Sequence, residues 1–111
     1  MAIQHWSNDT LLVDLPGEPE LQEELLEVAE LVRDHGACDV VMDFSAVTLL
    51  NSSCLATLLR LRQELLHHGR HLVLCNIGRA THGIFSVTGL TGVFEINDDR
   101  LKALATVQNC R

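Results

Sequence analysis

The sequence predicts an α/β fold with a mostly parallel, mixed sheet of about five strands and about four helices. Short apolar runs at 40–44 and 72–75 have the composition of interior strands that are covered on both faces. Segments with helical spacing lie between and around these runs, so strands and helices alternate along the chain. With 111 residues, 47% of them hydrophobic, the chain is expected to form a single domain over residues 1–111.

The first element expected is a β-hairpin. Trp6 is followed by turn-forming residues at 7–10 and then by Leu11-Leu12-Val13, so two short strands joined by a tight turn fit this segment. Pro16-Gly17-Glu18-Pro19 then breaks the pattern. Beyond it, apolar residues recur at steps of four and three, which predicts an amphipathic helix that Gly36 ends. These residues are Leu21, Leu25, Val28 and Val32.

The middle of the chain predicts a central strand followed by a helix. Val40 to Phe44 is apolar throughout, and Asn51-Ser52-Ser53 then offers side chains that accept hydrogen bonds from the free N–H groups of a helix start. Gly69 is expected to end this helix. Its leucines are too many for a single buried stripe, so one or two are expected on an exposed docking face. They include Leu55, Leu58, Leu59, Leu61, Leu65 and Leu66.

The last third continues the alternation. We expect a strand at Leu72–Cys75, a shorter helix at 78–87 ended near Gly89, and a strand at 93–96. A final helix from about 100 to 107 is capped by Asn97-Asp98-Asp99, with Leu101 and Leu104 against the sheet. Strand–helix–strand units of this length require right-handed crossovers and parallel pairing of their strands. The first strand is left to pair antiparallel at an edge of the sheet.

Charge and composition exclude several classes of partner. The formal net charge of -7 argues against nucleic acid, which needs a basic surface. The sequence contains no apolar run long enough to cross a bilayer, and the residues from Met1 to Trp6 do not resemble a secretion signal. A cytoplasmic protein without membrane insertion is therefore expected. Acids gather at 18–34 and arginines around the middle of the chain, which suggests separate acidic and basic faces; the arginines are Arg60, Arg62, Arg70 and Arg79.

Several residues invite a chemical interpretation beside a structural one. His67, His68 and His71 lie around Gly69 with spacing that does not favour a metal site, so we expect a solvated helix end and no metal or other cofactor. Asp43 ends a predicted buried strand, where it can bind a ligand or the nearby backbone. The cysteines at 38, 54, 75 and 110 lack C-x-x-C spacing and are expected to be reduced and buried. Cys54 could alternatively be a thiol nucleophile whose pKa the helix start lowers.

The stretch from Asp43 to Leu55, DFSAVTLLNSSCL, resembles the signature of the STAS family. In that family an apolar strand ends in Asp-hydrophobic-small, and Asp-Ser-Ser/Thr-Gly-Leu then opens a helix. Two later segments, GRHLVLCN at 69–76 and IFSVTGL at 84–90, resemble the family's Gly-Gly-strand and Leu-Phe-x-x-x-Gly-Leu motifs. Together the three motifs cover 40–96, just over half of the chain.

The resemblance implies a regulatory protein-binding module of the anti-sigma factor antagonist type, also called an anti-anti-sigma factor, rather than an enzyme. Such bacterial proteins bind an anti-sigma factor that is also a serine kinase, and phosphorylation of one serine ends the binding. That serine follows the motif's aspartate, which corresponds to Ser52. The resemblance puts the partner-binding residues at Asn51, Ser52, Ser53, Cys54 and Leu55, and the sequence leaves the oligomeric state open.

Three departures from the family pattern stand out. Asn51 takes the place of the family's aspartate, and Cys54 takes the place of its glycine. The loop at 16–20 reads Pro-Gly-Glu-Pro-Glu where the family offers Gly-x-Leu/Ile-Asp. The alternative function is therefore a STAS subunit that does not switch and belongs to a larger complex, such as a lipid-transport assembly. Without the family motif, Ser52 and Ser53 would be interpreted as plain capping residues of a helix.

Overall fold

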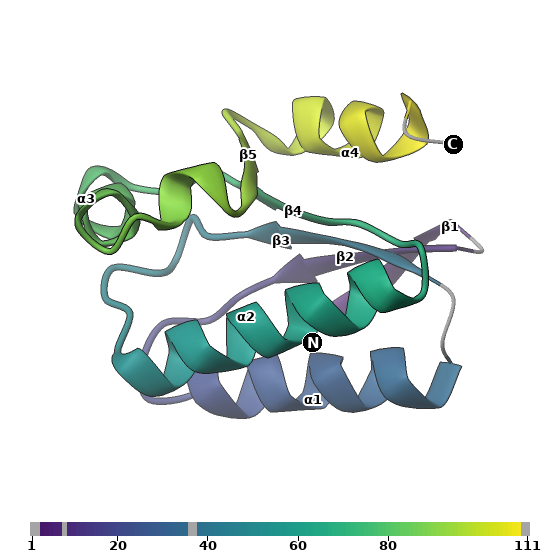
Figure 1. Cartoon of the computed structure of the whole chain (residues 1–111), viewed down its shortest axis with the longest axis horizontal. Helices are drawn as coiled ribbons and strands as arrows, with labels where there is room; N and C mark the ends of the chain where they lie inside the picture. Colours follow the sequence, from purple (N-terminus) through teal and green to yellow (C-terminus); the bar gives the residue numbers. More distant parts are fainter. Residues whose placement is uncertain (1–2, 8, 36–37, 110–111) are drawn as a thin grey trace.

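The computed structural model describes residues 3–7, 9–35 and 38–109. Strands and helices follow one another in the order that the sequence predicts (Figure 1). The elements are β1 (Ile3–Ser7), β2 (Thr10–Asp14), α1 (Leu21–His35), β3 (Asp39–Asp43), α2 (Ser52–His67), β4 (Leu72–Cys75), α3 (Arg79–Val87), the 3-10 helix η1 (Leu90–Gly92), β5 (Glu95–Asn97) and α4 (Arg100–Asn109).

The five strands form one mixed sheet in the order β1-β2-β3-β4-β5. β1 pairs antiparallel with β2, and every other neighbouring pair is parallel. The apolar strand β3 is central and buried along its whole length. The predicted fold class, the central strand and the antiparallel edge strand are therefore confirmed. All residues of β4 are buried too, which agrees with a strand covered on both faces.

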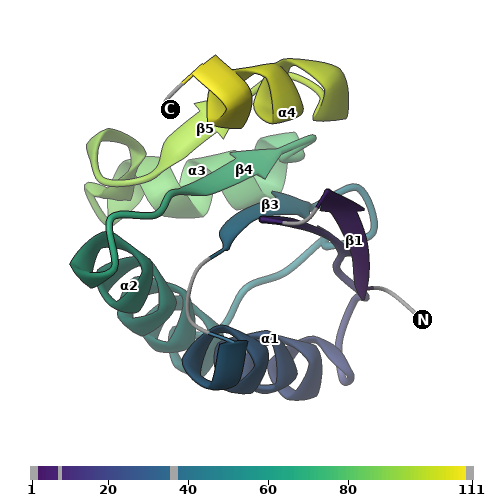
Figure 2. The same ribbon diagram turned by 90° about the vertical axis from the view of Figure 1, so that its right-hand side faces the viewer.

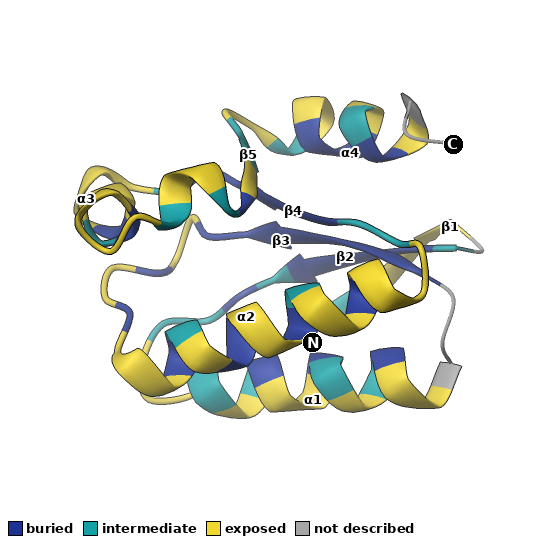
Figure 3. Ribbon diagram, viewed as in Figure 1, coloured by how far each residue is buried: buried dark blue, intermediate teal, exposed yellow. Residues whose placement is uncertain are grey.

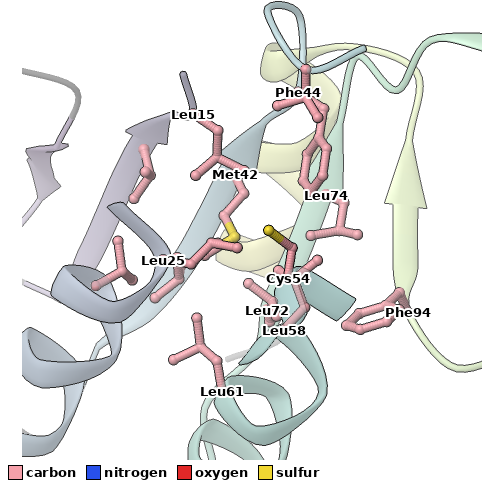
Figure 4. Packing of buried hydrophobic residues seen from close by; sticks show 14 of the residues in the cluster. Leu15, Leu25, Met42, Phe44, Cys54, Leu58, Leu61, Leu72, Leu74 and Phe94 are labelled. Carbon is pink, nitrogen blue, oxygen red and sulfur yellow. The ribbon is translucent and has the colours of Figure 1, made fainter. Parts of the chain in front are cut away.

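Helices cover both faces of the sheet. α1 and α2 lie side by side on one face, and α4 lies on the other, as two views at right angles show (Figures 1 and 2). α1 and α4 turn their buried sides toward the sheet (Figure 3). The larger core fills the space under α1 and α2, and Figure 4 shows part of it. The four residues of the predicted α1 stripe, Leu21, Leu25, Val28 and Val32, are all fully buried.

Two sequence-based expectations need correction in the last third of the chain. The strand predicted at 93–96 is β5 at Glu95–Asn97, because the N–H groups of Val93 and Phe94 both donate to the Leu90 carbonyl and so continue the helical turn. Leu101 does not contact the sheet, since 75% of it is exposed. The face of α4 that covers the sheet is formed by Ala103, Leu104 and Val107. Gly36, the expected end of α1, lies outside the described residues.

Two of the four arginines around the middle of the chain lie next to acidic groups. Arg60 lies in a groove beside α1, which carries five of the seven acids at 18–34, and Arg70 pairs with the carboxylates of Asp9 and Asp39. Acidic and basic groups therefore adjoin at these two places, and the wider separation into two faces stays a prediction. Within the described residues, none of the helices has the length and apolar content that a membrane span requires.

Candidate functional site

The candidate site is the first turn of α2, which follows the loop leaving β3. Asn51 is the N-cap, with φ -94° and ψ 173°, and its Oδ1 accepts a hydrogen bond from the Cys54 N–H at 2.8 Å. The Leu55 N–H donates to the Asn51 carbonyl at 3.1 Å. These two bonds fix the helix start at Ser52, within the segment 51–53 in which the sequence predicts it. An amide oxygen at residue 51 therefore provides the cap in place of a carboxylate.

The five residues predicted to bind a partner do not share one environment. Asn51, Ser52 and Ser53 are exposed next to one another, and Leu55 is half-buried. Cys54 is fully buried, and its sulfur lies among core side chains (Figure 4). The structure therefore brings three polar side chains and part of a leucine to the surface, and it directs the Cys54 side chain away from it.

The thiol of Cys54 is not activated by the helix start. Burial raises the pKa of Cys54, and the neighbouring Glu18 carboxylate, whose Oε1 accepts a hydrogen bond from Sγ at 3.5 Å, raises it further. The lowered pKa expected for a first-turn thiol is wrong, because loss of hydration and a nearby negative charge outweigh the helix dipole. A buried, protonated thiol is a poor nucleophile, so the geometry gives no support to thiol catalysis.

Glu18 is a residue of this site that the sequence motifs do not reveal. It is exposed, and the loop between β2 and α1 carries it to the first turn of α2. The preceding Gly17 packs closely on the loop after β3, because a Cβ at this position would lie 3.1 Å from the Ala46 carbonyl oxygen. A negative charge therefore stands beside the start of α2 although residue 51 is neutral. Contact between two loops so distant in sequence has no local signature.

The α1 helix also supports the site. The Thr57 hydroxyl donates to the Ser53 carbonyl at 3.0 Å, and Gln22 Nε2 of α1 donates to the Thr57 hydroxyl at 3.1 Å. Thr57 is buried, so this chain of bonds is shielded from water. The first turn of α2 is thus held from within by its cap and from the side by α1.

Asp43, at the end of β3, fixes the loop that leads to this turn. One carboxylate oxygen accepts from the Ser45 N–H at 2.8 Å and from the Ser45 hydroxyl, and the other accepts from Asn76 and Arg100. Burial alone would raise the pKa of Asp43, but these hydrogen bonds outweigh it and the pKa is lowered. All of these partners belong to the protein, so the structure favours the interpretation of Asp43 as a residue that binds nearby groups of the chain.

The histidines at the end of α2 do not form a cluster. The rings of His67 and His68 are 5.9 Å apart and nearly perpendicular, and His68 is close to Glu64. Among the residues that the structure describes, no three side chains of His, Cys, Asp or Glu gather as metal ligands would. The buried, unpaired thiols expected from the sequence are observed at Cys38, Cys54 and Cys75, and Cys110 lies outside the described part.

Solved structures of similar fold come from regulatory and transport proteins. An anti-sigma-factor antagonist (STAS) domain protein from Planctomyces limnophilus has a TM-score of 0.82 at 17% identity, over 96% of both chains. The cell fate determinant SpoIIAA of Bacillus, in its phosphorylated form, has a TM-score of 0.70 at 17% identity, over 98% of this chain and 97% of that one. A sulfate transporter family protein from Wolinella succinogenes has a TM-score of 0.73 at 14% identity, over 92% and 85%.

At these identities the likeness establishes the fold alone, and a comparison with the curated proteins finds no match by sequence. The family is established by the sequence itself. The profile of the STAS domain matches residues 13–103, which run from β2 into α4 and include the whole first turn of α2. This chain therefore belongs to the STAS domain family.

Proposed function

We propose that this chain is a regulatory protein-binding module of the anti-sigma factor antagonist type. Its partner is an anti-sigma factor with serine kinase activity, which docks on the first turn of α2 around Asn51, Ser52 and Ser53. Phosphorylation of Ser52 ends this docking. The proposal implies a cytoplasmic protein that acts by binding rather than by catalysis.

The observation that carries the proposal is the exposed Ser52 side chain at the first position of a firmly capped helix. A phosphate here would add about two negative charges beside N–H groups and the positive end of the helix dipole. The domain can therefore accept the modification without unfolding. A partner that packs on the same turn would meet a new charge and lose contact.

Relatives of the same fold support this switch. The similar structure of SpoIIAA is that of a phosphorylated form, and the Planctomyces protein is described as an anti-sigma-factor antagonist. The neutral Asn51 does not weaken the helix start, because its amide oxygen caps the Cys54 N–H. Glu18 supplies a carboxylate near this turn, where the family's aspartate would have provided one.

A second candidate is a STAS subunit of a larger complex that does not switch, such as a lipid-transport assembly. Its support is the similar fold of a sulfate transporter family protein. In this case the first turn of α2 would be a permanent contact, and Ser52 would only start the helix. The two candidates differ in whether modification of Ser52 controls binding.

The experiment begins with the tagged chain purified from its source cells, followed by identification of bound proteins and of phosphorylated residues by mass spectrometry. The dissociation constant of the purified partner is then measured for the wild type, Ser52→Ala and Ser52→Asp. We expect Ser52→Ala to bind like the wild type and Ser52→Asp to bind at least tenfold more weakly. Ser53→Asp is the matched control for a negative charge at the neighbouring residue, and it should have a smaller effect.

A phosphate on Ser52 together with this difference in affinity would establish the switch. Equal affinities of Ser52→Ala and Ser52→Asp for the partner would refute it. Recovery of transporter subunits in constant ratio, with Ser52 unmodified, would favour the second candidate.

A further inference from the structure

α2 has three faces, which differ in how far they pack within the domain. The first faces the core and is formed by Cys54, Thr57, Leu58, Leu61 and Leu65. The second borders α1 across a groove of about 330 Å³ that includes Arg60 and Glu64. The third contributes no residue to that groove, and apart from Leu55, which packs on the edge of the core, its side chains have no place in the core cluster; we name it the α2 strip. Its residues are Ser52, Leu55, Leu59, Arg62 and Leu66.

The spacing of the α2 strip is that of a surface built to pack on another helix. Its members follow one another at steps of three, four, three and four residues, which is the a/d pattern of two-stranded helical packing. Leu59 is 37% exposed and Leu66 is 44% exposed, while Leu55 is half-buried. Single exposed leucines are ordinary on protein surfaces, but the exposed Leu59 and Leu66 continue the line that the half-buried Leu55 begins, and together the three form one seam.

Arg62 gives the strip a chemical preference. It is half-buried between leucines, and among the residues described here no carboxylate pairs with it. Arg70 and Arg100, by contrast, each pair with two carboxylates. A partner covering the strip would remove water from the Arg62 guanidinium, which requires an acidic group in exchange. The strip itself contains no carboxylate, so a second copy of the chain does not supply one through the same face.

We infer that the α2 strip is the docking surface for an amphipathic helix of the protein partner, one that carries apolar residues at heptad spacing and an Asp or Glu opposite Arg62. A helix of about 15 residues, roughly 22 Å long, would cover the strip. α2 lies at the margin of the helical layer, with α1 along one flank (Figure 2). This inference rests on the proposed function, because Ser52 is the first residue of the strip and a phosphate there would stand at one end of the seam.

The test uses two synthetic helical peptides of about 21 residues as probes. Both have leucines at heptad a and d positions, one has glutamates at the positions that flank this seam, and the other has lysines there. We expect the glutamate peptide to bind and to shift the amide resonances of 52–66. Arg62→Glu should weaken its binding at least tenfold and should improve binding of the lysine peptide. Arg60→Glu, on the flank facing α1, is the matched control and should change both affinities by less than about threefold.

The leucines are tested in the same way. Leu59→Ser and Leu66→Ser should each weaken binding of the glutamate peptide about tenfold, because each removes an apolar contact from the seam. Leu26→Ser is the matched control, since Leu26 is also 45% exposed but lies in the groove between α1 and α2. Leu26, Leu59 and Leu66 are all partly exposed to solvent. Comparing the thermal unfolding of each variant with that of the wild type checks that the variant is folded.

Three results would overturn the inference. One is the absence of binding by either peptide, and another is an equal loss of affinity in Leu26→Ser and Leu59→Ser. The third is self-association of the chain that Leu59→Ser abolishes, which would assign the strip to a second copy. The switch is judged separately. If the strip variants bind the purified partner more weakly while Ser52→Asp binds it as the wild type does, the proposed switch fails and the docking surface stands. If Ser52→Asp weakens binding of the partner while the strip variants do not, the inference of a docking surface fails and the switch stands.

Discussion

Arg100, the first residue of α4, donates from Nε and Nη2 to one carboxylate oxygen of Asp43, at 3.2 and 3.0 Å. The same guanidinium also pairs with Asp14 at the end of β2. Asp43 in turn holds Ser45, at the start of the loop that leads to α2. One cluster of charged groups therefore ties α4 to the ends of two strands and to the loop before the candidate site.

Replacing Arg100 by leucine should lower the free energy of unfolding by about 1–3 kcal/mol, because it leaves the buried Asp43 carboxylate without its cation. The partial exposure of Arg100 keeps the value below that of a fully buried pair. Urea denaturation followed by circular dichroism measures the change. Lys102→Leu is the control, since Lys102 pairs with Asp98 at the surface, and it should cost less than about 0.5 kcal/mol. Similar losses in both variants would contradict the assigned role of Arg100.

Asp43 should also make folding sensitive to acid. The pKa of Asp43 is lowered in the folded protein, so at acidic pH the unfolded chain binds a proton that the folded chain does not. Its contribution to stability is complete above the pKa of the unfolded state and disappears as the pH falls through the lower, folded pKa. The free energy of unfolding of the wild type should therefore fall more steeply below about pH 5 than that of Asp43→Asn. Parallel curves for the two proteins would show that Asp43 does not titrate differently on folding.

The fold was predictable because its signals are local. Gly69, with φ 72°, ends α2 at the residue that the sequence indicates, and Asn51 caps the same helix through a contact three residues away. The bond between Arg100 and Asp43 joins residues 57 positions apart, and no spacing rule connects them. Glu18 reaches α2 only because two loops pack together. The motif marks Asn51, Ser52 and Ser53 as a site. The burial of Cys54, however, depends on how the first turn of α2 is oriented relative to the core.

Asn51 should tolerate a carboxylate but not the loss of its side-chain oxygen. Asn51→Ala removes the acceptor for the Cys54 N–H and should cost about 1 kcal/mol of stability. Asn51→Asp keeps that acceptor and adds a charge that the helix dipole favours, so its stability should equal or exceed that of the wild type. Chemical denaturation of the three proteins at low and high salt tests both statements. A loss in Asn51→Asp as large as that in Asn51→Ala would show that residue 51 does not act as a cap.

Cys54 should react slowly with alkylating reagents at neutral pH. Burial and Glu18 both raise the pKa of Cys54, so less thiolate is present than in a free thiol and little of it is accessible. Iodoacetamide labelling followed by peptide mapping should show modification of Cys54 at least tenfold slower than that of a model thiol, and urea should abolish the difference. Glu18→Gln should move the pKa of Cys54 downward while the side chain stays buried. Rapid labelling of Cys54 in the native protein would contradict its position in the core.

Truncation of two neighbouring leucines of α2 should destabilise the protein to very different extents. Leu58 is fully buried, whereas Leu59 is 37% exposed on the α2 strip. Leu58→Ala would leave a cavity in the larger core, which also contains Leu72 of β4 and Phe94, the residue before β5 (Figure 4), and should cost about 2–5 kcal/mol of unfolding free energy. Leu59→Ala should cost less than about 1 kcal/mol, because its side chain is already in contact with water. If Leu59→Ala is as destabilising as Leu58→Ala, the strip is part of the core and is not free to bind a partner. A small loss, together with weaker binding of the glutamate peptide, would separate the contribution of Leu59 to docking from any contribution to folding.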